Sequence, residues 1–180
     1  MRVTREKSIG LIVDVQERLV PVIHEHEKVI HNIDILIKGL KLLDVPLLWM
    51  EQYRKGLGDT VQPLRSELEP LTPIEKNCFS CCDQPLFMEN LGLKNKQFVI
   101  IAGVESHICV MQTVVDLIDN GYIPVVVSDA VSSRTIENKK VGIERMCNEG
   151  AIISSVESIL FELCRVSGTD AFKAISKLIK

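Results

Sequence analysis

Three residues of this chain have side chains whose types suit covalent catalysis. Cys109 stands where a helix is expected to begin, and Asp14 and Lys76 each follow a short apolar run. A thiol can attack a carbonyl carbon, a carboxylate can accept the thiol proton, and a lysine can offset the negative charge. Backbone N–H groups at a helix start favour a thiolate and can receive the oxyanion that forms on the carbonyl. The three residue types therefore predict acyl transfer.

These side chains can meet only if strands carry them to one edge of a sheet. Apolar runs rich in Val, Ile and Leu predict buried parallel strands at SIGLIVDV, VPLLWM, 98–102, 122–127 and 151–153, with a weaker strand at 71–75. Apolar residues at three- and four-residue steps predict helices at 27–44, 108–120 and 136–148, followed by two short helices within 154–180. Strand and helix alternate along the chain.

The alternation predicts a three-layer α/β/α fold with a Rossmann-like parallel sheet of roughly six strands. The 180 residues suit a single domain over 1–180, with no internal repeat or linker. Ligands of open α/β sheets bind beyond the carboxyl ends of the strands, where the strand order reverses. If the strand before Lys76 sits two places from the strand before Asp14, the lysine must bridge roughly 10 Å.

Composition and charge exclude several classes of protein. Hydrophobic residues make up 46% and charged residues 25%, as in soluble globular proteins. The net charge of −3 and the lack of a basic run argue against nucleic acid as a partner. No apolar run approaches ~18 residues, so a membrane partner is not expected, and without a signal-peptide pattern we expect a cytoplasmic protein. The six cysteines are then expected to be reduced thiols.

The chain resembles the isochorismatase-like cysteine hydrolase superfamily over nearly its whole length. The matching segments are LIVDVQERL with Asp14, EKNCFS with Lys76 and GVESHICV with Cys109. The resemblance implies the isochorismatase-like hydrolase fold and a catalytic triad of these three residues. It also implies a cis peptide between Val104 and Glu105, and an oxyanion hole made by the backbone N–H groups of Glu105 and Cys109.

One departure from the superfamily bears on metal and substrate. Nicotinamidases of the superfamily bind a metal through an Asp-x-His motif after the second strand, where this chain reads WMEQY without a histidine. We therefore expect metal-independent chemistry without a cofactor. Isochorismatases resemble this fold but cleave a vinyl ether without needing the cysteine. The presence of Cys109 thus favours hydrolysis of a C–N bond in a small amide or carbamoyl compound through a Cys thioester.

Four further side chains are weaker candidates for the substrate pocket: Gln16, Gln52, Tyr53 and His107. A polar loop would explain Gln52 and Tyr53 equally well. A satisfied histidine at a helix start is a commoner role for His107 than lining a pocket. The predicted helix at 108–120 is apolar on nearly all sides, which indicates burial on more than one face. A small-molecule substrate and a homo-oligomer, dimer or higher, are the partners we expect.

Other functions stay open on the sequence. Vinyl ether hydrolysis in the isochorismatase manner would use Asp14 and Lys76 and spare the cysteine. A noncatalytic interaction protein could retain the fold with Cys109 as inert packing, which is the commoner role of a lone cysteine. Cys78, Cys81 and Cys82 could form a zinc site, although no second Cys or His pair stands at ligand spacing. They could also serve a thiol redox protein, although a thioredoxin-like motif is expected at a different position in the fold.

Overall fold

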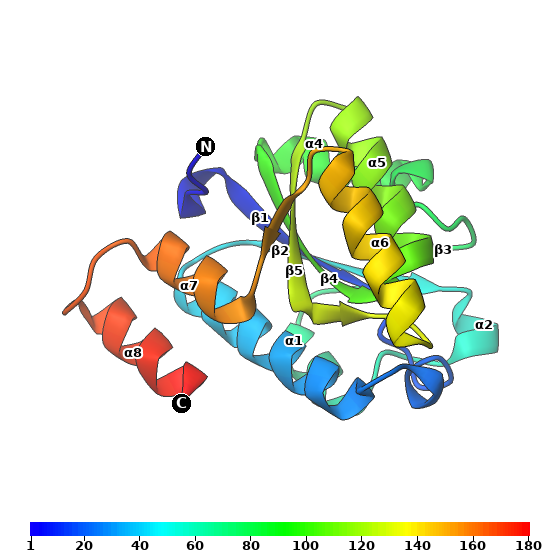
Figure 1. The fold of residues 1–180 in the computed structure, drawn as a ribbon, viewed down its shortest axis with the longest axis horizontal. Helices are drawn as coiled ribbons and strands as arrows, with labels where there is room; N and C mark the ends of the chain where they lie inside the picture. Colours follow the sequence, from blue (N-terminus) through cyan, green and yellow to red (C-terminus); the bar gives the residue numbers. More distant parts are fainter.

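Six parallel strands form the centre of the computed structural model, which describes residues 1–180 (Figure 1). The strands are β1 (Ser8–Val13), β2 (Leu47–Gln52), β3 (Ile74–Lys76), β4 (Phe98–Val104), β5 (Ile123–Ser132) and β6 (Ile152–Ser154). They lie in the order β3-β2-β1-β4-β5-β6. The order reverses at β1, between β2 and β4, so a ligand site is expected at the carboxyl ends of β1 and β4. The predicted fold class is confirmed.

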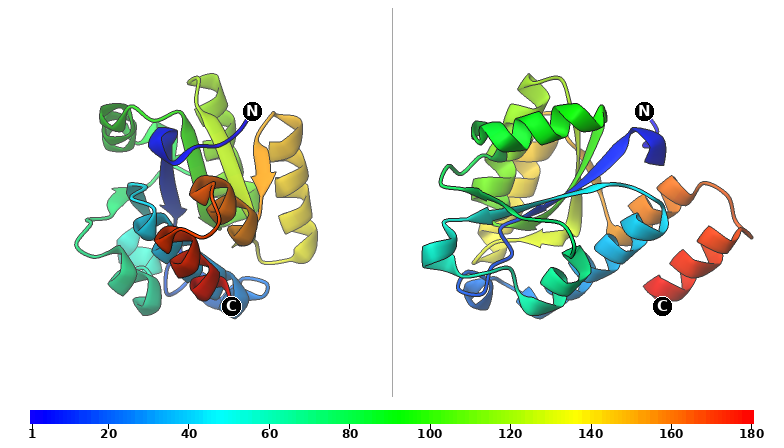
Figure 2. Two further views of the ribbon diagram at one scale, coloured as in Figure 1. Left: turned by 90° about the vertical axis from the view of Figure 1, so that its left-hand side faces the viewer. Right: turned by 180° about the vertical axis from the view of Figure 1, so that it is seen from behind.

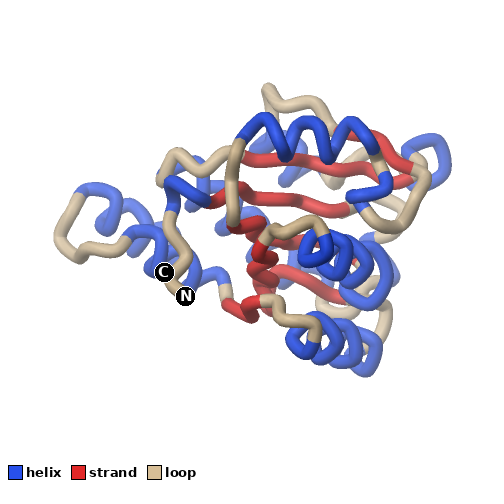
Figure 3. The backbone as a smooth tube through the Cα atoms, turned by 90° about the horizontal axis from the view of Figure 1, so that it is seen from above, coloured by secondary structure: helices blue, strands red, loops and turns tan.

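Helices cover both faces of the sheet, as the view from above shows (Figure 3). One layer contains α4 (Pro85–Lys94), α5 (Met111–Asp119) and α6 (Ile136–Asn148). The other contains α1 (His26–Leu42), α3 (Gln62–Leu68), α7 (Val156–Cys164) and α8 (Asp170–Ile179). The short elements are α2 (Arg54–Leu57), the 3₁₀ turns η1 (Arg5–Lys7), η2 (Val20–Val22) and η3 (Cys81–Asp83), and the π turn η4 (Ser106–Val110). Helix α8 lies outermost, against α1 and α7 (Figure 2).

Alternate side chains of the four central strands, β1, β2, β4 and β5, pack into two separate cores. In β4, Ile100 packs into the core under α1 and α7, whereas Val99 and Ile101 pack into the core under α4, α5 and α6. All seven residues of β4 are buried, because a parallel sheet covered by helices on both faces exposes neither side. None of the helices combines the length and apolar character needed to cross a membrane.

The strands differ from their predicted bounds by a few residues, β3 and β5 most clearly. The weak strand expected at 71–75 is β3, which ends at Lys76, so the lysine is the last residue of the strand rather than part of the following loop. Strand β5 continues past 127 through Asp129 and Ser132. The Asp129 carboxylate accepts from Val156 N–H at the start of α7, and the Ser132 hydroxyl donates to the His24 carbonyl.

The helices differ from prediction mainly where the repeating apolar pattern covers only a few residues. Helix α6 has the predicted bounds, since Thr135 caps its start and Gly150 follows its end. The helix expected from Ile108 begins instead with the π turn η4, and α5 proper starts at Met111. Helices α2, α3 and α4 were not predicted, because four to ten residues give a weak periodic signal.

Candidate active site

Strands β1 and β3 bring Asp14 and Lys76 together at the carboxyl edge of the sheet. Asp14 follows the last residue of β1 with a positive φ of 53°, and β3 lies two places away, beyond β2. The Lys76 side chain spans β2, and its Nζ lies 2.7 Å from Asp14 Oδ2. Both side chains are fully buried. The pair is therefore a buried ion pair that the strand order makes possible.

Four acceptors surround the Lys76 ammonium group. Besides Asp14, Nζ donates to Gln52 Oε1 at 2.6 Å and to the carbonyl oxygens of Cys78 at 3.2 Å and Phe79 at 3.1 Å. Burial disfavours the ammonium form, but the charge and hydrogen bond of the Asp14 carboxylate favour it, and the pKa of Lys76 is raised. Lys76 is thus held as a cation.

The third candidate, Cys109, lies in the π turn η4 that follows β4. The cis peptide between Val104 and Glu105, implied by the resemblance, is present at the start of this turn. The N–H groups of Ile108 and Val110 both donate to the Glu105 carbonyl. The Glu105 N–H donates to no backbone carbonyl. This N–H therefore has no backbone partner of its own.

Cys109 and Asp14 are close enough to shift the pKa of each other. Burial raises the pKa of the Cys109 thiol to about 12, and the Asp14 carboxylate adds to this, with Lys76 opposing. The expectation that a helix start would stabilise a resting thiolate is wrong, because loss of water and a like charge outweigh the turn's N–H groups. Burial also raises the pKa of Asp14, against the effect of Lys76.

One of the two carboxylate oxygens of Asp14 accepts no hydrogen bond. Oδ2 accepts from Lys76, whereas Oδ1 is buried without a hydrogen-bond partner. An unpaired buried carboxylate oxygen is costly to maintain, and this one belongs to the carboxyl that interacts with the Cys109 thiol. The arrangement can pass the thiol proton to Asp14.

Several contacts fix the turn that carries Cys109. The hydroxyls of Ser106 and Ser133 are 2.6 Å apart, and His107 Nδ1 lies 2.9 Å from the same Ser133 hydroxyl. On the other side, α6 packs so closely that a Cβ on Gly142 would lie 2.6 Å from the Ser106 carbonyl oxygen. The Glu105 carboxylate accepts from Arg134 Nε at 2.9 Å.

The four weaker candidates fall into different surroundings. Gln16 is buried, and its amide is engaged with backbone groups of Gln52 and Gly58, so it holds the loop after β2. Gln52 contacts Lys76 directly. Tyr53 is half exposed and donates its N–H to the Lys76 carbonyl. His107 binds Ser133, as described above. Only Gln52 and Tyr53 border Lys76.

Three buried residues near the site were not among the candidates for the catalytic triad or the substrate pocket. Glu51, at 1% exposure, accepts from the N–H and hydroxyl of Thr60, and its charge contributes to the raised pKa of Asp14. Cys81 is fully buried beside the triad, whereas its neighbours Cys78 and Cys82 are partly exposed. Thr113 contacts both Cys109 and Cys81. The one sequence feature that could have identified Thr113 is its position four residues, about one helical turn, after Cys109.

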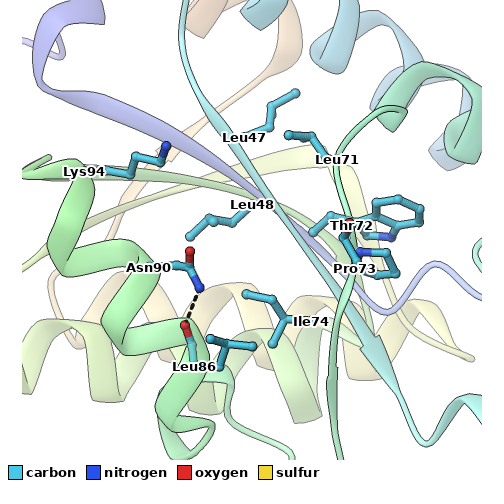
Figure 4. A pocket seen from close by; sticks show the side chains of 10 residues that line it. Leu47, Leu48, Leu71, Thr72, Pro73, Ile74, Leu86, Asn90 and Lys94 are labelled. Atoms are coloured by element: carbon cyan, nitrogen blue, oxygen red, sulfur yellow. Dashed lines mark hydrogen bonds between the residues drawn. The ribbon is translucent and has the colours of Figure 1, made fainter.

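The triad does not line a wide cavity in the single chain. A cavity of about 330 Å³ lies instead at the β2–β3 edge, between Leu47, Leu48, Ile74 and Leu86 (Figure 4). None of the five principal cavities is lined by Asp14, Lys76 or Cys109. Cys109 keeps 7% of its surface exposed. All six cysteines are free, and no cluster of three or more His, Cys, Asp or Glu side chains is arranged to hold a metal ion.

Comparisons with known sequences identify related proteins over most of the chain. An isochorismatase-domain family model matches residues 8–158. The chain is similar to a secreted isochorismatase effector of Phytophthora sojae, with 38% identity over 99% of this chain and 87% of that protein. It is also similar to isochorismatase domain-containing protein 2A of Mus musculus, with 36% identity over 99% of this chain and 85% of that protein.

Solved structures point the same way. A Caenorhabditis elegans protein described as MAR1 ribonuclease superposes with a TM-score of 0.93 at 36% identity, covering 99% of this chain and 92% of that one. The Escherichia coli ycaC gene product, described as an octameric hydrolase of unknown specificity, superposes with a TM-score of 0.94 at 23% identity. The two chains are covered to 99% and 89%, and the second likeness shows the fold alone. This chain belongs to the isochorismatase family.

Proposed function

We propose that this protein is a cysteine hydrolase that cleaves the C–N bond of a small amide or carbamoyl compound. The observation that carries the proposal is the buried, unpartnered Oδ1 of Asp14 on the carboxyl that interacts with the Cys109 thiol, while Lys76 holds Oδ2. A base, a nucleophile and a fixed cation thus meet in one place. Membership of the isochorismatase family supports hydrolase chemistry in general.

The first half of the reaction forms a thioester. Because the pKa of Cys109 is about 12, the thiol is protonated at rest, and Asp14 removes its proton as sulfur adds to the substrate carbonyl carbon. The carbonyl oxygen becomes an oxyanion, which accepts hydrogen bonds from the N–H groups of Glu105 and Cys109. The C–N bond then breaks, and Asp14 returns the proton to the leaving amine.

The second half releases the product acid. Asp14, ionised again, takes a proton from water as the water oxygen adds to the thioester carbonyl. The C–S bond breaks, the sulfur recovers a proton from Asp14, and the acid leaves. Throughout, Lys76 remains charged and stabilises whichever negative charge is present on Asp14 or Cys109.

The test is a screen of small amides, ureides and carbamoyl compounds on the purified protein, with released ammonia or amine as the measurement. Cys109→Ala should abolish turnover, and Cys147→Ala, which removes an exposed thiol, should leave it unchanged. An acid-quenched reaction should show a mass adduct on the Cys109 peptide. Undiminished amide hydrolysis by Cys109→Ala contradicts the proposal.

Two other substrates belong in the same screen. Isochorismate tests vinyl ether hydrolysis: if Cys109→Ala cleaves it at the wild-type rate and no amide is turned over, that reaction replaces the one proposed. A short RNA tests the activity named for the Caenorhabditis elegans relative. The net charge of −3 gives no support to an RNA substrate, and we expect no cleavage.

The proposal includes assembly and location. The description of the Escherichia coli neighbour as octameric supports a homo-oligomer, as do exposed apolar side chains such as Phe79, Leu86 and Leu93. A cytoplasmic location stays part of the proposal, since the Phytophthora sojae relative is named as secreted. Size-exclusion chromatography with light scattering measures the assembly.

A further inference from the structure

Thr113 joins two parts of the site that come from distant parts of the chain. It lies on α5, one helical turn after Cys109, and is fully buried. Its hydroxyl donates to the Cys109 carbonyl at 2.7 Å and accepts from the Cys81 N–H at 2.9 Å. The hydroxyl thus lies directly between the turn that carries the thiol and a segment 32 residues earlier.

The segment that ends at Cys81 also holds the lysine. The carbonyl oxygens of Cys78 and Phe79, just before Cys81, accept from Lys76 Nζ. Fixing the Cys81 N–H therefore fixes the carbonyl groups that orient the ammonium group. Through this chain of contacts the Thr113 hydroxyl connects Cys109 to the Lys76–Asp14 pair.

A purely local interpretation accounts for only half of this geometry. Threonine in a helix often donates its hydroxyl to the carbonyl four residues earlier, and the bond to Cys109 is of this kind. The bond from Cys81 is different, because it comes from another element, the 3₁₀ turn η3. A hydroxyl that serves both bonds constrains two segments relative to each other.

We propose that Thr113 is a positioning residue, whose hydroxyl holds the Cys109 turn in register with the segment that orients Lys76. The inference rests on the proposed function for its effect on turnover, but its effect on the thiol does not need that function. Thr113→Val keeps the shape of the side chain and leaves the Cys81 N–H and the Cys109 carbonyl without their partner. Thr113→Ser keeps the hydroxyl.

The experiment compares these variants by two measurements. The first is the rate of alkylation of Cys109 by iodoacetamide as a function of pH, resolved by peptide mass so that the other thiols do not interfere. The second is amide hydrolysis, separated into kcat and KM. Ser8→Ala is the matched control, because it removes a buried hydroxyl that donates to the Thr4 carbonyl at the far end of β1.

We expect Thr113→Val to shift the pH profile of Cys109 alkylation and to lower kcat on the order of tenfold to a hundredfold, since small displacements of reacting groups have effects of this size. KM should change little. Thr113→Ser and Ser8→Ala should behave like the wild type. A valine variant with wild-type alkylation and kcat, or a serine variant as impaired as the valine variant, overturns the proposal.

The outcomes separate this proposal from the function on which it partly rests. If no amide is hydrolysed but the valine variant still shifts the alkylation profile, the function fails and the positioning role stands. If the valine variant does not fold, Thr113→Ala takes its place, and hydrogen exchange of the Cys81 amide is measured in the wild type and in Thr113→Ser. A Cys81 amide that exchanges freely in the folded wild type overturns the proposal.

Discussion

Polar residues at the two edges of the sheet differ in their exposure to solvent. At the carboxyl edge, Asp14, Lys76 and Glu51 are each at most 1% exposed. At the amino edge, α4 and α5 end in exposed turns at Asn95 and Asn120. The turns of the amino edge are open to solvent, whereas the buried polar groups of the carboxyl edge depend on one another.

The space around the glycines also differs between the two edges. A Cβ on Gly103, at the carboxyl end of β4, would lie 2.1 Å from the Val13 carbonyl oxygen, whereas a Cβ on Gly92 or Gly121, near the amino edge, would meet nothing within 4 Å. Crowded backbone and buried charge occur together at one edge because both hold side chains in fixed positions. The comparison teaches that substitutions of one type should have unequal effects at the two edges.

We expect the largest difference between the two edges when an aspartate at each edge is replaced by asparagine. Asp14→Asn keeps the shape of the side chain but removes the base, and we expect amide hydrolysis to fall by about 10⁴-fold, as when another hydrolase loses its catalytic carboxylate. Asp119→Asn, on the exposed end of α5, should leave the rate unchanged. Initial rates of amine release measure both. Equal rates for the two variants would break the comparison.

Two lysines should differ in their contribution to stability. Lys76→Met leaves the Asp14 carboxyl buried without its cation, so we expect the free energy of unfolding to fall by about 3–5 kcal/mol. Lys96→Met removes a partly exposed lysine that donates to the Glu6 carbonyl, and the loss should stay below about 1 kcal/mol. Urea titrations measure both values. Adding Asp14→Leu to Lys76→Met should restore part of the stability, and a further loss would contradict the interpretation.

The thiol should respond to pH according to its raised pKa. Only the thiolate reacts with iodoacetamide, and the pKa of Cys109 is about 12. Its alkylation rate should therefore rise about tenfold per pH unit. This rise should continue well above pH 9, until the pH reaches that pKa. Asp14→Asn removes a negative charge that raises the pKa, so at a fixed lower pH Cys109 should react faster although hydrolysis is lost. Slower alkylation in this variant would contradict the assignment of causes.

The smallest inequality should concern two helical glycines. Gly142→Ala places a Cβ 2.6 Å from the Ser106 carbonyl oxygen and 2.9 Å from the His107 backbone nitrogen. The Cys109 turn or α6 must therefore shift. We expect a loss of about 1–3 kcal/mol in unfolding free energy, as for overpacking, together with lower activity. Gly92→Ala meets no neighbour and should gain up to about 1 kcal/mol from helix propensity. Thermal and urea unfolding compare them.

The sequence predicted those parts of the molecule that local patterns determine. The bounds of α6 follow from its periodicity and caps, and the buried strand β4 follows from its continuous apolar run. The proximity of Asp14 to Lys76 depends on the strand order, which alternation with right-handed crossovers restricts to few arrangements. The resemblance to a known superfamily supplied the triad as a hypothesis.

The rest depends on packing between distant segments. The raised pKa of Cys109 could not be predicted, because a local rule about helix starts carries no information on how much water the tertiary structure excludes. The engagement of Gln16 with Gly58 and the bridge from Thr113 to Cys81 each join segments more than 30 residues apart. Such contacts leave no periodic trace in the sequence.

Strand β3 has a consequence for how the candidate site loses its geometry. It pairs only with β2, through three residues, at the end of the sheet, yet it supplies Lys76. Short edge segments open by local fluctuations that cost less free energy than global unfolding. Detachment of β3 would separate the charge pair while the other five strands remain folded. The working lifetime of the site under heat or denaturant is then set by the fraying of one edge strand rather than by the melting of the domain.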